Sequence, residues 1–600
     1  MSQRSTLIYD GACNICREWV NNWQKLTGNK VIYRPYQEAA PDFSDISLDE
    51  FKRSIYLIEA DSGKVSSGAE AAFRLNSNSF PYSLLLFLYK TLPGFAFLSE
   101  LAYQFFSKHR AILTVVTHVF WGRNFQPSEY YLLTRFFLIF LGCIYFGAFA
   151  SFAVQAQGLI GSDGILPLSP YLDRLNEHFG NDAILKAPMI FWINASNPMI
   201  QFTCIAGCLF SLLVIFNRFT WPSLLMLYVL YLSLYYAGQI FMSYQWDILL
   251  LEVGFLAIFI GQGSRIVVWL YRWLMFRFML LGGLVKLISR DPTWDNLTAL
   301  TYHFETQPLP APLAWYAHQL PEIILMVAVA ITLIVEIVLP FLIFTPRRIR
   351  FIAAGCFILL QIAIILTGNY NFFNLLPLAL CLLLFDDAAL KTLMPGRVAA
   401  YFSNNNVIKE SRVKFMALIL LTVVLVYSSV DNLNYYLSGD RNKKLSLLSQ
   451  SLIPLIIVNN YGPFAVMTTT RNEIIVEGSA DGISWREYKF NHKPDDLNKP
   501  LTWIIPHQPR LDWQMWFAAL SSVESQIWFR RFLYLLLYNE PRVTDLLKEN
   551  PFAQSAPKYV RASFFKYNFT NQTQRENTGN IWVREYLRPY HPPFRLKSDL

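Results

Sequence analysis

The sequence predicts a multi-domain protein with three parts: a small N-terminal α/β domain, a polytopic α-helical membrane bundle and a β-rich soluble domain at the C-terminal end. Of the 600 residues, 54% are hydrophobic and 16% are aromatic, and the mean hydropathy is +0.30. The middle of the chain repeats apolar stretches close to the roughly 20 residues that cross a bilayer. Strand-like patterns lie on both sides of this region, which places the three parts at 1–120, 121–433 and 434–600.

The charge and the short motifs exclude several classes of protein. A formal charge of +9 is modest for this length and is typical of basic residues beside membrane spans, so we expect no nucleic acid as a partner. The seven cysteines form no extracellular disulfide framework. No nucleotide-binding glycine loop, zincin helix or G-x-S-x-G elbow occurs, and we expect neither a cofactor nor a bound metal.

The N-terminal part reads as strand, loop, helix, strand and hairpin. Residues 6–11 are β-rich, 16–28 have helical spacing that ends at a glycine, 30–36 form a second strand, and 53–68 alternate around Asp-Ser-Gly. The apolar segment 80–106 is interrupted by Lys90, Pro93, Gly94 and Glu100. We therefore expect it to form packed helices of the first domain and not a membrane span.

Cys13 and Cys16 form a C-x-x-C pair between the first strand and the first helix. At a helix N-terminus the thiolate of Cys13 would be stabilised and would attack a disulfide, and Cys16, one turn further, would resolve the mixed disulfide. Two other interpretations stay open: an inert scaffold that keeps two thiols, and half of a metal site. His109 and His118 are remote in sequence from the pair.

Nine apolar stretches between 130 and 433 predict about nine spans. An odd number places the two ends of the chain on opposite sides of the membrane. Basic residues gather before the first span and after the even-numbered spans, and no secretory signal precedes the first strand, so we expect the N-terminal domain in the cytoplasm and the C-terminal domain outside it. The predicted spans are 132–154, 198–216, 222–242, 246–263, 266–288, 321–345, 350–368, 371–386 and 413–431.

Several charged side chains fall inside these apolar stretches. Glu252, Arg272, Arg277 and Glu336 are candidates for intramembrane charge pairs, because a charge within a bilayer is costly unless it is paired or reaches water. Such residues either serve a function or lock helices together, and we favour the second interpretation. In the loop after the fifth span, His303 and Glu305 suggest a catalytic pair, whereas the surrounding aromatic residues favour a membrane-interface belt.

The C-terminal part returns to soluble patterns. Residues 473–490 alternate around an Asp-Gly turn and predict a β-hairpin, 516–539 read as one helix, and 557–570 and 580–590 read as further strands. We therefore expect a β-rich domain.

Two resemblances extend this interpretation. The segment 7–16, "LIYDGACNIC", resembles the YDGxCxxC signature of DCC-family thiol-disulfide oxidoreductase-like domains, which implies a thioredoxin-like fold and a thiol-redox partner. Five segments look like the lipase maturation factor family of polytopic membrane proteins. They include "YQWDILLLEVGFLAIF", "YGPFAVMTTTRNEIIVEGSADGISWREYKF" and "PHQPRLDWQMWFAAL", and they keep their order between about 130 and 595.

This second resemblance implies a membrane factor that helps exported lipases to fold and assemble. Members that carry a DCC-like domain look bacterial, which implies the inner membrane. In the segment 506–520 we expect Arg510, Asp512, Trp513 and Trp516 to form a structural or client-contacting surface. The expected partners are membrane lipids, an exported client protein such as a lipase and a thiol-redox protein.

Three hypotheses about function follow. The first is a membrane-embedded maturation factor with an appended redox domain. The second is a membrane-anchored thiol-disulfide oxidoreductase that uses Cys13 and Cys16. The third is a membrane enzyme that acts on a lipid-like substrate through charged residues near Glu252 and the loop of His303.

Overall fold

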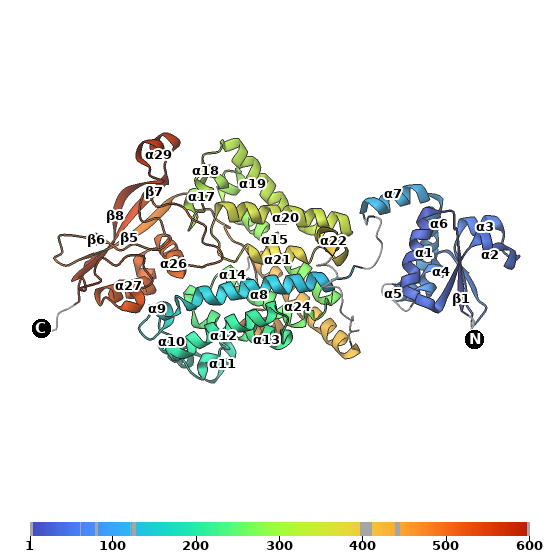
Figure 1. Cartoon of the computed structure of the whole chain (residues 1–600), viewed down its shortest axis with the longest axis horizontal. Coiled ribbons are helices and arrows are strands. Elements are labelled where there is room, and N and C mark those ends of the chain that lie inside the picture. The colour runs from blue at the N-terminus through green and yellow to red at the C-terminus, as the bar shows by residue number, and fades with distance from the viewer. Residues whose placement is uncertain are drawn as a thin grey trace. The chain divides into compact units, whose positions relative to one another are not determined.

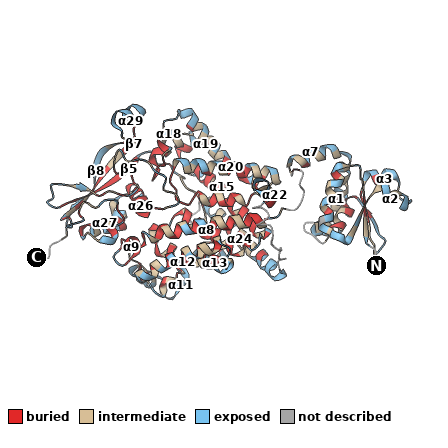
Figure 2. Cartoon of the chain, in the orientation of Figure 1, coloured by how far each residue is buried: buried red, intermediate tan, exposed pale blue. Residues whose placement is uncertain are grey.

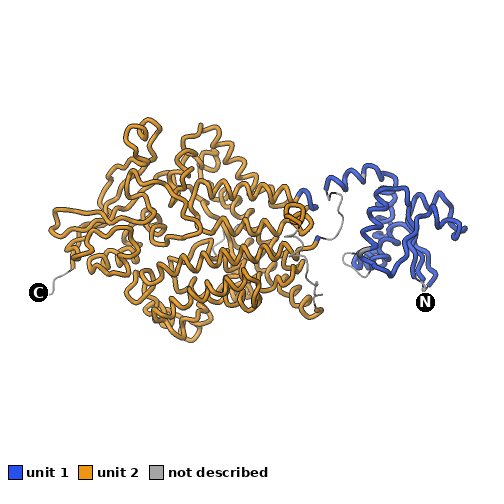
Figure 3. Tube along the Cα trace, in the orientation of Figure 1, with its two compact units in different colours: residues 1–128, 346–349 blue, residues 129–345, 350–600 orange. Residues whose placement is uncertain are grey.

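The computed structural model of the chain describes residues 4–60, 62–77, 82–120, 122, 128–396, 411–438 and 444–596. By internal contacts the chain divides into two compact units, residues 1–128 with 346–349 and residues 129–345 with 350–600 (Figure 3). The C-terminal strands therefore belong to the same compact unit as the membrane bundle. The three-part division at residues 120 and 433 stays a prediction.

The first unit is built on a four-stranded mixed sheet in the order β2-β1-β3-β4 (Figure 1). β1 (Ser5–Tyr9) pairs in parallel with β2 (Val31–Pro35), and it pairs antiparallel with β3 (Tyr56–Ile58), which forms a hairpin with β4 (Val65–Ser67). α1 (Asn14–Thr27) connects the two parallel strands and ends at Gly28, whose φ is 56°. The predicted order of strand, loop, helix, strand and hairpin is confirmed.

Four further helices of this unit come after the last strand in the sequence. α3 (Leu48–Arg53) precedes β3, and α4 (Gly68–Leu75), α5 (Tyr82–Thr91), α6 (Phe95–Lys108) and α7 (Arg110–Phe120) come after β4. α5 and α6 cover the segment predicted to be packed helices and not a span. They are separated at Gly94, whose left-handed φ of 83° suits a residue without a side chain.

The second unit contains the membrane bundle. Six helical segments of the described residues are long and apolar enough to cross a bilayer. Figure 2 shows buried residues gathered in the interior of this unit, along α8 and α15. The six segments are α8 (Tyr131–Ala153), α12 (Asn197–Ile215), α15 (Arg265–Ile288), α19 with its continuation (Glu322–Phe344), α20 (Arg347–Thr367) and α24 (Arg412–Ser438).

The predicted count of nine spans is not confirmed. α14 (Gln245–Ile260) has 16 residues and α21 (Leu375–Leu382) has eight, and at about 1.5 Å per residue both are shorter than the roughly 30 Å of a hydrocarbon core. α13 (Thr220–Ala237) has 18 residues, and its tyrosines and its Trp-Pro start make it less apolar than the six. All three lie within the bundle, packed between longer helices.

The C-terminal strands form an antiparallel sheet in the order β6-β5-β7-β8. β5 (Arg471–Ser479) and β6 (Arg486–Glu487) make the predicted hairpin, and β7 (Tyr559–Phe569) and β8 (Trp582–Phe594) are the two further predicted strands. The single helix predicted for 516–539 is wrong. α26 (Arg510–Ala519) ends inside this range, and α27 (Ile527–Leu537) begins only after residues 520–526.

Candidate functional site

The C-x-x-C pair lies at the start of α1, in the first unit. Cys13 directly precedes the helix, Cys16 lies in its first turn, and both are half-buried free thiols. Burial, together with a hydrogen bond between the two thiols, raises the pKa of Cys16 to about 12. Cys16 therefore stays protonated at neutral pH, which is the state expected of a resolving cysteine before a mixed disulfide forms.

Asp10 shapes the loop that carries the thiols. Its Oδ1 accepts hydrogen bonds from the Ala12 amide and from the Gln37 side chain, each at 3.0 Å. Gln37 in turn accepts a hydrogen bond from the Gly11 amide at 3.1 Å. A Cβ atom at Gly11 would lie 2.7 Å from the Cβ of Pro35 at the end of β2, so only glycine fits there. The Asp-Gly dipeptide of the signature is therefore explained by the packing of the loop against β2.

Arg110, the first residue of α7, completes this site. It donates to Asp10 Oδ2 at 3.0 Å and to the carbonyl of Lys52 at 2.6 Å. Its positive charge lowers the pKa of Cys16 and so opposes the effect of burial on that thiol. In the sequence, Arg110 is only one of the basic residues that precede the first predicted span. No local signal connects positions 13 and 110.

The metal interpretation gains no ligands in this region. Within the described ranges, no three His, Cys, Asp or Glu side chains are grouped as a metal ion would require. His118 lies 3.0 Å from the carboxylate of Glu18 on α1 and so contributes to packing between α7 and α1.

A second cluster of functional candidates joins the C-terminal domain to the bundle. The guanidinium of Arg510 on α26 binds both carboxylate oxygens of Asp247 on α14, at 2.7 and 2.8 Å. It also donates to the carbonyl of Phe241, and Tyr231 on α13 donates to Asp247 at 2.6 Å. Arg510 is 1% exposed and Asp247 is 0% exposed. We call this pair with its partners the buried joint.

Backbone contacts continue the buried joint along α8. The Gln508 amide donates to Ser151 Oγ at 2.8 Å, and the Arg510 amide donates to Gln155 Oε1 at 2.8 Å. Gln155 returns a bond to the carbonyl of Gln508 at 2.8 Å. The segment before α26 is therefore hydrogen-bonded to the last turns of a membrane-spanning helix.

The other predicted residues of this segment are also buried. Asp512 accepts from the amides of His492 and Lys493, at 2.7 and 2.9 Å, and burial raises its pKa. Trp513 packs edge-on against Trp246 of α14, and Trp516 donates its indole N–H to the carbonyl of Thr306 at 2.8 Å. In this structure the four predicted residues hold elements together and do not present a free surface to a client.

Three of the four predicted intramembrane charges lie in ion pairs, one of them with Lys286. Arg277 donates to Glu252, and Glu252 also accepts from Tyr461 at 2.7 Å and from the Asn459 side chain at 3.1 Å. Glu336 pairs with Lys286 at 2.5 Å. The first pair thus connects α14 and α15 to the segment that leads into the C-terminal sheet.

Arg272 differs from the other predicted charges. Its guanidinium donates to the carbonyl of Leu383 at 3.2 Å and to the hydroxyl of Tyr130 at 3.0 Å, and no carboxylate is among its partners in the described part of the chain. Arg272 was predicted to pair with a carboxylate. In the structure a backbone carbonyl and a hydroxyl accept its hydrogen bonds instead.

His303 and Glu305 do not form a catalytic pair. The Nε2 atom of His303 lies 3.3 Å from the hydroxyl of Tyr370, and burial lowers the pKa of His303 to about 4. Glu305 points elsewhere and accepts from the Phe569 amide at the end of β7 at 2.8 Å. On an α-helix, residues two apart face different directions, which separates the two side chains.

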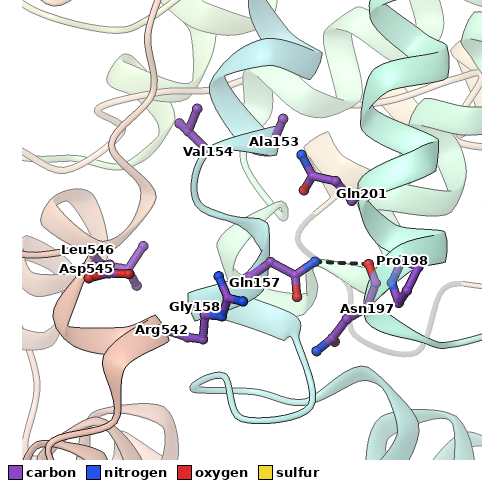
Figure 4. A pocket seen from close by; sticks show the side chains of 10 residues that line it. All are labelled: Ala153, Val154, Gln157, Gly158, Asn197, Pro198, Gln201, Arg542, Asp545 and Leu546. Carbon is purple, nitrogen blue, oxygen red and sulfur yellow. Dashed lines mark hydrogen bonds between the residues drawn. The ribbon is translucent and has the colours of Figure 1, made fainter.

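The structure also shows a cavity that no sequence pattern indicated. It has a volume of about 460 Å³ and lies between α9 (Ala156–Ile160), the start of α12 and α28 (Pro541–Thr544) (Figure 4). Gln157 donates to the Asn197 carbonyl there at 3.0 Å. Its lining is mixed, with three amide side chains, a guanidinium and a carboxylate beside apolar side chains such as Val154 and Leu546.

These features indicate a polytopic membrane protein whose C-terminal β domain is bound to its helical bundle through buried contacts. A separate thiol domain precedes the bundle in the sequence. Residues 132–392 match the lipase maturation factor transmembrane domain, 457–592 the lipase maturation factor C-terminal domain, and 7–115 the DCC1-like thiol-disulfide oxidoreductase. The chain belongs to the lipase maturation factor family.

Similar curated proteins agree with this assignment. Lipase maturation factor 2 of Xenopus laevis is 34% identical over 575 residues, which cover 76% of this chain and 81% of that protein. Lipase maturation factor 1 of Bos taurus is 32% identical over 510 residues, covering 78% and 90%. Lipase maturation factor 2 of Homo sapiens is 32% identical over 587 residues, covering 77% and 82%. No solved structure matches the chain.

Proposed function

We propose that this chain is an integral membrane maturation factor for exported proteins such as lipases, and that Cys13 and Cys16 belong to an appended thiol-redox module. The observation that carries the proposal is the buried joint in a chain of this family. Arg510 and Asp247 fix the C-terminal domain to the bundle, so that a client would meet one composite surface. The four residues at 510, 512, 513 and 516 then support this surface from beneath.

The experiment that tests this proposal measures an exported lipase. The chain is expressed with the lipase in a host that lacks its own maturation factor, and secreted activity is divided by secreted lipase protein. We expect the full chain to raise this ratio, Arg510→Ala to abolish the gain, and the double variant Cys13→Ser/Cys16→Ser to retain it. A full chain that leaves the ratio unchanged would refute the proposal.

A second candidate function rests on the geometry of the thiols. The Cys13 thiolate would attack a substrate disulfide and release one substrate sulfur as a thiolate. Cys16 would then give up its proton and attack the Cys13 sulfur, releasing the second substrate thiolate. The pair ends oxidised and the substrate ends reduced, and a thiol partner must reduce the pair again. If the double cysteine variant loses all activity on the lipase, this function takes precedence.

The contacts at the two ends of α8 support our proposal for the orientation of the chain. At its start, the Leu132 and Leu133 amides donate to Asp387, whereas its end contacts Gln508 in the buried joint. Within the second unit, the C-terminal sheet therefore lies at the end of α8 opposite to the one where the chain enters (Figure 1). Basic residues such as Arg265 and Arg412 begin helices at the entry end. This supports a cytoplasmic N-terminus and an extracytoplasmic C-terminal domain. The proposed membrane is a bacterial inner membrane, on the ground of the DCC1-like N-terminal domain.

Thiol labelling tests this orientation. An impermeant maleimide is applied to intact cells and to opened membranes, with the double cysteine variant as background. A cysteine placed at Ile483, which is 83% exposed in the C-terminal domain, reports the other side. We expect Cys13 and Cys16 to react only after opening and the position 483 cysteine to react in intact cells. Reaction of both in intact cells would contradict the orientation.

A further inference from the structure

The inward face of α6 is polar. Glu100 accepts from the amides of Ala69 and Glu70 at the start of α4, at 3.2 and 3.0 Å. Tyr103 accepts from the Ile55 amide at 3.0 Å, and Ser107 donates to the carbonyl of Arg53 at 2.5 Å. Positions 100, 103 and 107 lie on one stripe of the helix, and this stripe faces the rest of the unit.

The outward face of α6 is apolar. Phe97, Leu98, Leu101 and Phe105 follow one another at helical spacing, and their exposed fractions are 70%, 61%, 53% and 59%. A helix at the surface of a water-soluble domain has the opposite arrangement, with its apolar stripe inward. In α6 the apolar side chains therefore face outward and the polar side chains face inward, the reverse of a helix on a water-soluble domain.

α7 repeats this inversion. Its inward side carries Arg110, which binds Asp10, and His118, which lies beside Glu18. Its outward side carries Ile112, Val115 and Val119, with exposed fractions of 64%, 63% and 55%. Two consecutive helices thus expose apolar side chains along their outward sides, and monomeric soluble domains rarely expose apolar surface of this extent. We call these stripes of α6 and α7 the apolar face.

Charge and chain length indicate what covers the apolar face. Glu100 is the only acidic residue in α5, α6 and α7, and it points inward, whereas Lys90 and Lys108 at the ends of α5 and α6 are exposed. Residues 121–130 connect α7 to the membrane-spanning helix α8, and ten residues reach at most about 35 Å. The face therefore stays within reach of the bilayer that holds α8.

We propose that the apolar face of α6 and α7 inserts into the headgroup and acyl boundary of the membrane leaflet next to the first unit, and that it prefers anionic lipid. Interfacial helices bind in this way, with apolar side chains in the acyl boundary and basic side chains at the headgroups. The thiol domain is then held on the membrane surface by its own helices as well as by its connection to α8.

Photo-crosslinking in the full chain tests the proposal. Benzoylphenylalanine replaces Phe97 or Val115 in protein reconstituted in nanodiscs of phosphatidylcholine and phosphatidylglycerol. The matched controls are Leu48 on α3 and Val65 on β4, which are 57% and 50% exposed in the same unit. We expect lipid adducts at positions 97 and 115 in several-fold excess over positions 48 and 65. Equal lipid yields at all four positions, or adducts at 97 and 115 to this chain or to a second copy, would overturn the proposal.

The lipid preference is tested by composition. The yield of lipid adduct at position 97 is compared between nanodiscs with phosphatidylglycerol and nanodiscs of phosphatidylcholine alone. We expect a higher yield with the anionic lipid and loss of that difference in the double variant Lys90→Gln/Lys108→Gln. An unchanged yield between the two compositions would refute the anionic preference. Insertion of the apolar face is decided separately by the crosslinking at positions 97 and 115.

Discussion

Two arginine–carboxylate pairs of this protein differ in burial, and this difference matches their roles. Arg110 and Asp10 lie beside the thiols with side-chain exposures of 24% and 16%, and one hydrogen bond joins them. Arg510 and Asp247 are almost fully buried and share two hydrogen bonds between α26 and α14. The first pair leaves the guanidinium partly exposed and close to the sulfurs of Cys13 and Cys16. The second holds α26 against α14 through two hydrogen bonds between buried charges.

The largest effect is expected from breaking the buried joint. Arg510→Ala leaves the Asp247 carboxylate buried without its cation, which costs about 3–5 kcal/mol. In purified protein, thermal unfolding of the second unit should shift to clearly lower temperature. Arg530→Ala, which removes an exposed arginine on α27, is the control and should leave the transition unchanged. Equal shifts for both variants would show that the joint does not stabilise this unit.

A smaller loss is expected at the pair of Glu252 and Arg277. Glu252→Gln keeps the shape and two possible hydrogen bonds, but leaves the charge of Arg277 with only the carbonyl of Asn459 and a neutral amide. We expect a destabilisation of about 2 kcal/mol, measured by the same unfolding transition. A variant as stable as the wild type would show that this charge pair is dispensable for folding.

At the pair of Arg110 and Asp10 we expect an effect on thiol reactivity rather than on folding. Arg110→Gln removes a charge that lowers the pKa of Cys16. A higher thiol pKa means less thiolate at a given pH, so alkylation between pH 7 and 9 should slow roughly three- to tenfold, since one pKa unit changes the thiolate fraction about tenfold.

Two variants control this measurement. Arg110→Lys keeps the positive charge and should recover most of the rate. Arg34→Gln removes a different arginine of the same unit, one that pairs with Asp42, and should leave the rate unchanged. A similar slowing in both glutamine variants would point to a general effect of charge and not to the position of Arg110.

The smallest effect is expected in the loop itself. Gly11→Ala places a Cβ atom 2.7 Å from Pro35, so the loop must move. We expect a loss of about 1 kcal/mol in the unfolding of the first unit, in line with modest overpacking. Ala12→Ser at the exposed neighbouring position is the control. If Gly11→Ala and the control have the same free energy of unfolding, the close approach of Gly11 to β2 does not contribute to stability.

Local patterns in the sequence were sufficient for the elements themselves. The alternation of residues 6–11 and 53–68 predicted β1, β3 and β4, and the apolar lengths predicted the six long helical segments. They also predicted spans at α14 and α21, which are shorter than the six long segments, because a buried apolar helix of a bundle has the same apolar pattern as a short membrane span. The same limitation merged the end of α26 with α27, since the turn between them contains no proline or glycine.

Short windows of the sequence are sufficient for the class of protein, because the YDGxCxxC loop, the apolar segments and the family motifs are all local patterns. The partners of the charged residues, in contrast, are known only from the folded chain. Arg510 meets Asp247 across 263 positions, and Arg110 meets Asp10 across 100. The physical reason is that a buried charge must find its partner in space, and the partner can lie anywhere along the folded chain.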